Sequence, residues 1–186
     1  MKKLIAISGP AGVGKGTLVQ MLTERNEDIV ASVSCTTRAP REGEIDGVHY
    51  FFLTKEAFLQ KIGEDGFLEY DKHFDNYYGT PKDFVFETLQ SKNVILEIEV
   101  NGVMAVKEKY PSLLTIMVVP PSLEALKNRL IGRNSETEET LQKRLARVEY
   151  ELSFRDRYDE VVVNDDLEQA YSKLLKIIRS EITIRR

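Results

Sequence analysis

ISGPAGVGKGT, residues 7–17, is the stretch of sequence that decides the fold. An apolar run at residues 4–7 leads into it and has the composition of a short buried strand. The glycines of the stretch let the backbone turn tightly and approach a ligand without obstruction by a Cβ atom. Residues 17–22 then have helical character, so the free N–H groups and positive dipole end of a helix face any anion in the loop. The pattern therefore predicts a polyphosphate-binding loop between a strand and a helix.

The spacing within this loop fits the GxxxxGK pattern of P-loop proteins. Lys15 adds a mobile cation where the β- and γ-phosphates of a nucleotide lie in that pattern. The alternative is a glycine-rich turn with a solvated lysine, but it leaves the register of the glycines and the lysine unexplained. We expect the phosphates of a nucleotide to contact the whole loop, which consists of Gly9, Pro10, Ala11, Gly12, Val13, Gly14, Lys15, Gly16 and Thr17.

Gly16 departs from the usual pattern, because many P-loops carry at this position a Ser or Thr that ligates Mg²⁺ directly. Thr17 offers a hydroxyl one residue later. The protein ligands of the metal therefore stay unknown at this point, and we expect Mg²⁺ to be held chiefly by phosphates and water.

The chain has 186 residues, of which 42% are hydrophobic and 30% charged, and this favours one compact domain. No run approaches the ~20 apolar residues needed to span a bilayer, and the start MKKLIAISGP turns too soon into glycines for a secretory signal. Cys35 is the only cysteine, which excludes an intramolecular disulfide and agrees with a reducing compartment. We therefore expect a cytoplasmic protein without a membrane partner.

The net charge of −4 argues against a nucleic-acid partner, because phosphate backbones are bound by clustered Lys and Arg. An anionic substrate must then be bound locally. Arginines bind phosphate oxygens bidentately, although any single arginine is more often a solvated surface residue. Three groupings are candidate phosphate clamps: Arg38 with Arg41, Arg129 with Arg133, and Arg144 with Arg147.

Apolar runs alternate with helical patterns along the chain, at residues 4–7, 29–34, 94–98, 114–119 and 161–163. This alternation predicts an α/β fold with a mostly parallel sheet of about five strands flanked by helices. Ligands of such a sheet bind at the carboxyl ends of its strands. Helix starts are indicated at Ser122, at Ser135 with Glu138, and at Asp165 or Asp166.

Four further segments resemble consecutive signatures of guanylate kinase, a nucleoside monophosphate kinase of the P-loop class. They are VSCTTRAPREGEIDGVHYFF (33–52), GFLEYDKHFDNYYGTPK (66–82), RLIGRNSETEETLQKRL (129–145) and VVVNDDL (161–167). The resemblance covers nearly the whole chain. It implies a single domain with a core (1–33, 82–128 and 148–186), a small mixed α/β GMP-binding insert (about 34–81) and a helical lid (about 129–147).

The resemblance also implies the reaction, which is transfer of the γ-phosphoryl group of ATP to GMP or dGMP with Mg²⁺, in purine nucleotide metabolism and GMP recycling. It implies no obligate protein partner. Two alternatives stay open. One is a non-catalytic guanylate-kinase-like module that binds proteins, against which the intact P-loop argues, and the other is a kinase of another small phosphate ester.

By the resemblance, Arg38, Arg41, Tyr50 and Tyr78 bind the GMP phosphate, while Ser34, Glu69 and Thr80 bind guanine. Guanine offers hydrogen-bond donors at N1 and N2, so an anionic Glu69 can accept hydrogen bonds from it. Adenine lacks both donors, so it would not fit this site. Each assignment has a structural alternative. The tyrosines could pack within the insert, Glu69 could be an exposed carboxylate, and Thr80 could cap a helix over 82–90 with its hydroxyl as acceptor, which leaves the hydroxyl proton for the base.

In the lid, the resemblance implies that Arg133 and Arg144 reach ATP and the transferring phosphoryl group, assisted by Arg129. With Lys15 and Arg38 they form the expected catalytic set, because positive charge stabilises the equatorial oxygens of a loose transition state. No general base is required, since a phosphate monoester is mostly dianionic at pH 7.

Several further positions depart from the family pattern or have two interpretations. Glu99, where the family commonly has Asp, is expected near the GMP ribose or a metal-bound water, and Asn101 and Asp75 also depart from the family pattern. Asn164 resembles the residue near the ATP base, but Asn-Asp-Asp also reads as a plain helix start. Cys35 and two histidines form no recognisable thiol or zinc site, so we expect Cys35 to be packed.

Overall fold

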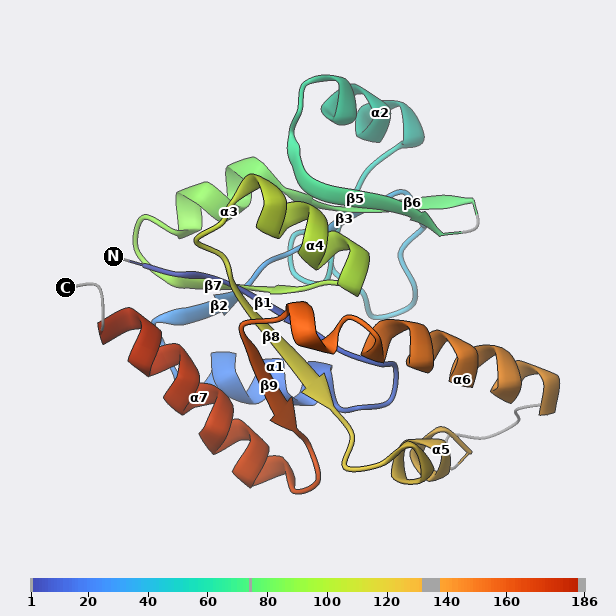
Figure 1. The fold of residues 1–186 in the computed structure, drawn as a ribbon. Helices are drawn as coiled ribbons and strands as arrows, with labels where there is room; N and C mark the ends of the chain where they lie inside the picture. Colours follow the sequence, from blue (N-terminus) through green and yellow to red (C-terminus); the bar gives the residue numbers. More distant parts are fainter. Residues whose placement is uncertain (1, 74, 132–137, 184–186) are drawn as a thin grey trace.

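A five-stranded parallel sheet forms the centre of the protein in the computed structural model, which describes residues 2–73, 75–131 and 138–183 (Figure 1). Its order is β2-β7-β1-β8-β9. The strands are β1 (Leu4–Ser8), β2 (Ile29–Ala31), β7 (Asn93–Glu97), β8 (Leu114–Val119) and β9 (Glu160–Val163). The predicted fold class is confirmed. β2 is shorter than the predicted strand 29–34, because the chain leaves this sheet after Ala31 to enter a second one.

Helices cover both faces of the parallel sheet (Figure 1). α1 (Lys15–Arg25) and α7 (Leu167–Thr183) lie on one face, and α3 (Lys82–Thr88) and α4 (Val100–Lys109) lie on the other. A short 3₁₀ helix, η1 (Arg155–Arg157), leads into β9. Both faces of the sheet are therefore buried, which explains why its strands are continuous apolar runs.

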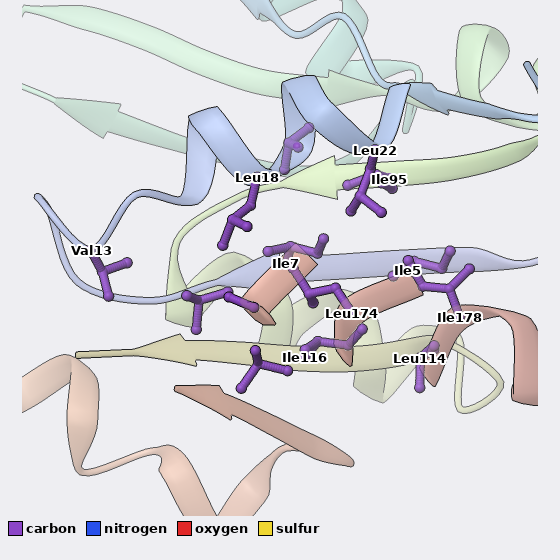
Figure 2. Close-up of a cluster of buried hydrophobic side chains, with 14 of the residues drawn as sticks. Ile5, Ile7, Val13, Leu18, Leu22, Ile95, Leu114, Ile116, Leu174 and Ile178 are labelled. Atoms are coloured by element: carbon purple, nitrogen blue, oxygen red, sulfur yellow. The ribbon is translucent and has the colours of Figure 1, made fainter. Parts of the chain in front are cut away.

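Side chains of β1 alternate between two hydrophobic clusters. Ile5 and Ile7 pack with Leu18 of α1 and Leu174 of α7, as Figure 2 shows, whereas Ala6 packs into the cluster beneath α4. This period-two alternation is the expected behaviour of a strand buried on both sides. It holds the end of β1, from which the P-loop begins, between two packed layers.

A second, smaller sheet has the order β4-β3-β6-β5. Its strands are β3 (Cys35–Thr36), β4 (Phe51–Phe52), β5 (Phe67–His73) and β6 (Asn76–Pro81), with α2 (Lys55–Gly63) between β4 and β5. Phe58 and Phe67 stack at 4.4 Å between ring centroids and form a core with Cys35. Burial raises the pKa of Cys35 to about 12, as expected for a packed thiol. The domain boundaries at about 34 and 81 stay a prediction.

α5 (Leu123–Ile131) and α6 (Glu138–Leu152) lie beyond the carboxyl end of the parallel sheet, to the right in Figure 1. Two predicted helix starts are confirmed, because Ser122 accepts from the Ala125 N–H at 3.0 Å and Asp166 from the Gln169 N–H at 2.9 Å. Ser135 and Arg133 lie outside the described residues. Within the described part of the chain, no helix combines the length and apolar character that crossing a bilayer requires.

The alternating core of β1 generates a stability prediction. Ile5→Ala should lower the free energy of unfolding by about 2–5 kcal/mol, because Ile5 is fully buried and its loss leaves a cavity. The matched control is Ile45→Ala, where the residue is 59% exposed and a change within about 0.5 kcal/mol is expected. Urea denaturation of both variants measures the difference, and equal effects would contradict the packing described for β1.

Candidate active site

The P-loop connects β1 to α1 and has a backbone that only glycine adopts readily. Gly9, Gly12 and Gly14 have φ angles of 145°, 82° and 93°. A Cβ atom on Gly9 would lie 2.0 Å from the Val118 carbonyl oxygen, so the loop presses directly against β8. The glycine spacing read from the sequence therefore has two physical reasons, which are positive φ angles and contact with a neighbouring strand.

Lys15, at the start of α1, turns its side chain back over the loop. Its Nζ donates to the carbonyl oxygens of Gly9 at 2.5 Å and Pro10 at 3.2 Å. Burial lowers the pKa of Lys15, while the charges of Glu97, Glu151 and Glu99 oppose that shift. The ammonium group thus lies in a polar nest of carbonyls, close to carboxylates that favour its charged form.

Asn164, which follows β9, contacts the P-loop through its side chain. It is 5% exposed, and its side-chain amide donates to the Val13 carbonyl at 2.8 Å. A Cβ atom on Gly14 would lie 2.6 Å from the same amide nitrogen. Arg129 in turn donates to the Asn164 carbonyl at 3.0 Å. The helix start predicted within Asn-Asp-Asp is provided by Asp166, whereas the Asn164 side chain packs against the loop. The expected place of Asn164 near the ATP base stays a prediction.

A cavity of about 920 Å³ lies between the second sheet and the region where β7 gives way to α4. Its wall brings together all the predicted acceptor residues except Thr80, namely Ser34, Arg38, Arg41, Tyr50, Glu69, Tyr78 and Glu99. Thr80 is fully buried behind Glu69. Residues scattered over more than sixty positions of sequence thus face one another, and we call this space the acceptor cavity.

Arg38 is held in the acceptor cavity by Glu44, a residue that the sequence analysis missed. Its guanidinium donates to the two carboxylate oxygens of Glu44 at 2.9 and 2.8 Å and lies 5.4 Å from the Tyr50 ring centroid. The Arg38 hydrogen bonds, with one from the Arg41 N–H, lower the pKa of Glu44 to about 2. The position of Glu44 close to Arg38 in sequence was a signal for this pair, but a glutamate at that position also fits an exposed turn.

Glu69 and Thr80 form a direct pair at the inner end of the acceptor cavity. The Thr80 hydroxyl donates to Glu69 Oε1 at 2.6 Å. Burial raises the pKa of Glu69, and this hydrogen bond opposes the shift. The predicted capping role of Thr80 is wrong, because the residue before α3 is Pro81 and no side chain caps that helix. The Thr80 hydroxyl donates its hydrogen bond to Glu69, so its proton is not free for the guanine base, as the capping alternative required.

A second cavity, of about 440 Å³, joins the P-loop to the acceptor cavity, and we call it the transfer cavity. Its wall includes Gly9, Ala11 and Lys15 from the P-loop, and Ser34 and Tyr50 from the acceptor side. Glu97 and Glu99 line both cavities, and α6 contributes Arg147 and Glu151. Arg144, expected to act here, is an exposed residue of α6 and lines neither cavity.

Among the described residues, two places near the cavities offer oxygen or nitrogen ligands for a cation. Asp71, His73 and Glu99 each present one ligand atom, and these atoms lie within 4.8 Å of one another, but Glu99 already accepts from Arg147 at 2.7 Å. The other place is Glu97, whose carboxylate oxygens lie 3.7 and 3.9 Å from a Cβ atom built on Gly16. P-loop proteins also use a carboxylate outside the loop to hold Mg²⁺. Glu97 is the last residue of β7, which is paired with β1.

The fold and the two connected cavities define a P-loop phosphotransferase, with a donor loop at the carboxyl edge of a parallel sheet and, opposite it, an acceptor cavity that contains Arg38 and Arg41. The family model for guanylate kinase matches residues 1–181. The chain is 50% identical over 180 residues to a guanylate kinase of Synechocystis, covering 96% of this chain and 94% of that protein. It is 48% identical over 179 residues to one of Caldanaerobacter subterraneus, covering 96% and 87%.

A solved structure supports the same assignment. The crystal structure of guanylate kinase from Anaplasma phagocytophilum superposes with a TM-score of 0.76 at 30% identity, covering 97% of this chain and 86% of that chain. The chain therefore belongs to the guanylate kinase family. The family and enzyme class inferred from the four sequence segments are confirmed, while the roles of individual residues stay predictions.

The Arg38–Glu44 pair generates a test of the acceptor cavity. Glu44→Ala should raise the KM for GMP about tenfold and leave the KM for ATP within twofold, because it frees a guanidinium that is now held by two charge-assisted hydrogen bonds. Glu42→Ala, two residues away and exposed, is the matched control. Steady-state kinetics with each substrate varied in turn measures the effect, and a change confined to ATP would contradict this placement.

The Asn164–Val13 contact generates a test of the P-loop. Asn164→Ala should weaken ATP binding about tenfold, because the buried loop carbonyl loses its donor, and should leave GMP binding within twofold. Asp165→Ala, the exposed neighbour, is the control. Calorimetric titration of each nucleotide distinguishes the outcomes. Equal losses for both nucleotides would show that Asn164 supports the whole fold and not the loop.

Proposed function

We propose that this chain transfers the γ-phosphoryl group of ATP to GMP, and also to dGMP, within purine nucleotide metabolism and GMP recycling. The observation that carries the proposal is the connection between the two cavities. Lys15 faces the transfer cavity, Glu69 faces the acceptor cavity, and Glu97 and Glu99 line both. A donor held by the P-loop and an acceptor held opposite would meet with their phosphates together, which supports transfer between nucleotides over hydrolysis.

Guanine selectivity is assigned to Glu69 in this proposal. Thr80 occupies Oε1, so Oε2 is the carboxylate oxygen directed to the base, and Ser34 lines the same cavity. Gly102 supports this arrangement, because a Cβ atom there would lie 3.1 Å from Oε2. An anionic acceptor suits the N1 and N2 donors of guanine and is mismatched with adenine.

The phosphate of the acceptor is assigned to Arg38, Arg41, Tyr50 and Tyr78. Tyr50 and Tyr78 lie edge to face at 6.2 Å between ring centroids, with the Arg38 guanidinium over the Tyr50 ring. A dianionic monoester needs no base, so these residues bind and orient the nucleophilic oxygen. Lys15 then stabilises the transferring group, together with Arg133 and Arg144 as the predicted lid residues.

ATP binding is assigned to the loop from Gly9 to Thr17, supported by Arg129 and Asn164. Mg²⁺, when bound, neutralises charge on the donor phosphates. Glu97 fits such an ion or its waters, because it lies beside Gly16 and ends the strand adjacent to β1. The division into core, insert and lid, a cytoplasmic location and the absence of nucleic-acid, membrane or obligate protein partners remain part of the proposal.

A base-selectivity assay tests the proposed function. ADP release measured with GMP, dGMP, AMP, CMP and UMP as acceptors should show turnover with the two guanine nucleotides and little with the others. Glu69→Gln should weaken GMP binding by about 2 kcal/mol and leave ATP binding unchanged, because one charge-assisted hydrogen bond is lost. Glu87→Gln, an exposed carboxylate on α3, is the control. Absence of turnover with GMP, or preference for another base, would overturn the proposal.

A further inference from the structure

Arg147 projects from α6 to the transfer cavity, although the sequence analysis assigned the lid chemistry to Arg133 and Arg144. Its Nη2 donates to Glu99 Oε2 at 2.7 Å, and its Nε donates to Glu151 Oε1 at 3.1 Å. Glu151 lies one helical turn beyond Arg147 on α6, whereas Glu99 is the residue that precedes α4. The guanidinium therefore bridges the helix to the wall of the cavity.

The two carboxylates that hold Arg147 differ in burial. The Glu151 side chain is 10% exposed, and burial raises its pKa while Arg147 and Lys15 oppose that shift. The Glu99 side chain is 49% exposed. Removing a cation from a buried carboxylate is costly, whereas a pair with an exposed one contributes little. The contact of Nε with Glu151 is therefore the fixed one, and the contact of Nη2 with Glu99 is exchangeable.

The charges on the wall of the transfer cavity indicate that a further cation is needed when two nucleotides bind, and Arg147 can supply it. Among the described residues that line this cavity, Lys15 and Arg147 are the lysine and arginine side chains, and Glu97, Glu99 and Glu151 carry carboxylates. Two nucleotides would add several negative charges to this space. A phosphate presents more charge than a carboxylate and accepts from the guanidinium fork in bidentate fashion, so it competes effectively with Glu99 for Arg147.

We propose that Arg147 is a further catalytic residue, which exchanges Glu99 for the transferring phosphoryl group when both nucleotides are bound, with Glu151 as its positioning residue. In this step the acceptor phosphate oxygen bonds to the γ-phosphorus, the bond from that phosphorus to the bridging oxygen breaks, and its electron pair leaves with ADP. Arg147 donates hydrogen bonds to the equatorial oxygens and transfers no proton. The exchange also frees Glu99 to face the acceptor. This inference rests on the proposed function.

The test compares Arg147→Ala and Arg147→Lys with the wild-type chain, and Arg155→Ala, in the exposed 3₁₀ helix η1, is the matched loss of charge. Arg147→Ala should lower kcat about 100-fold with both KM values within threefold, because its contact forms mainly in the transition state. Arg147→Lys should recover little, because a point charge lacks the fork. Arg155→Ala should be unchanged.

A binding measurement separates this role from a structural one. ADP and GMP should bind each variant singly as they bind the wild type, whereas the ternary complex of ADP, GMP and aluminium fluoride should form about 100-fold more weakly with Arg147→Ala. Normal kcat, recovery by lysine, or equal weakening of ADP and GMP together with a lower melting temperature would each overturn the inference. If Arg147→Ala is unfolded, Arg147→Lys decides, because it keeps a cation between the carboxylates. A wild-type chain inactive with GMP would instead overturn the proposed function.

Discussion

The positive charge of Lys15 is the constraint around which the site is arranged. A partly buried ammonium group favours its neutral form unless dipoles and opposite charges surround it. Here the carbonyls of Gly9 and Pro10 accept from it, and the charges of Glu97, Glu99 and Glu151 oppose the loss of its proton. These carboxylates come from the end of β7, the residue before α4, and α6, so one charge connects the P-loop with three other parts of the chain.

Pairing of cations with acids before any substrate binds recurs across the site. Arg38 is held by Glu44 in the acceptor cavity, and Arg147 is held by Glu99 and Glu151 in the transfer cavity. Such pairs fix the orientation of guanidinium groups, and groups that are oriented in advance avoid a free-energy cost of reorientation during the reaction. In a chain with a net charge of −4, both guanidinium groups thus have carboxylate partners before a phosphate binds.

Features carried by neighbouring residues could be predicted from the sequence, and contacts between distant ones could not. The P-loop and the strands around it could be predicted because glycine spacing and apolar runs are local features of the sequence. The acceptor residues were predicted from the resemblance to the family. The Asn164–Val13 contact joins positions 151 residues apart and has no local signature. Thr80 was ambiguous because one hydroxyl suits both a helix cap and a carboxylate. The choice between Arg144 and Arg147 depends on which side chain of α6 lines the transfer cavity, and the sequence alone does not show how this helix is placed.

The central claim is that the P-loop and the acceptor cavity hold two nucleotides with their phosphates meeting beside Lys15. Calorimetric titration with adenosine and guanosine joined through five phosphates tests it most directly. The account predicts one molecule bound per chain, about 100-fold more tightly than ATP or GMP alone, and exclusion of both nucleotides. Binding no tighter than ATP, with GMP still able to bind, would show that the two cavities do not form one continuous site and would contradict the account.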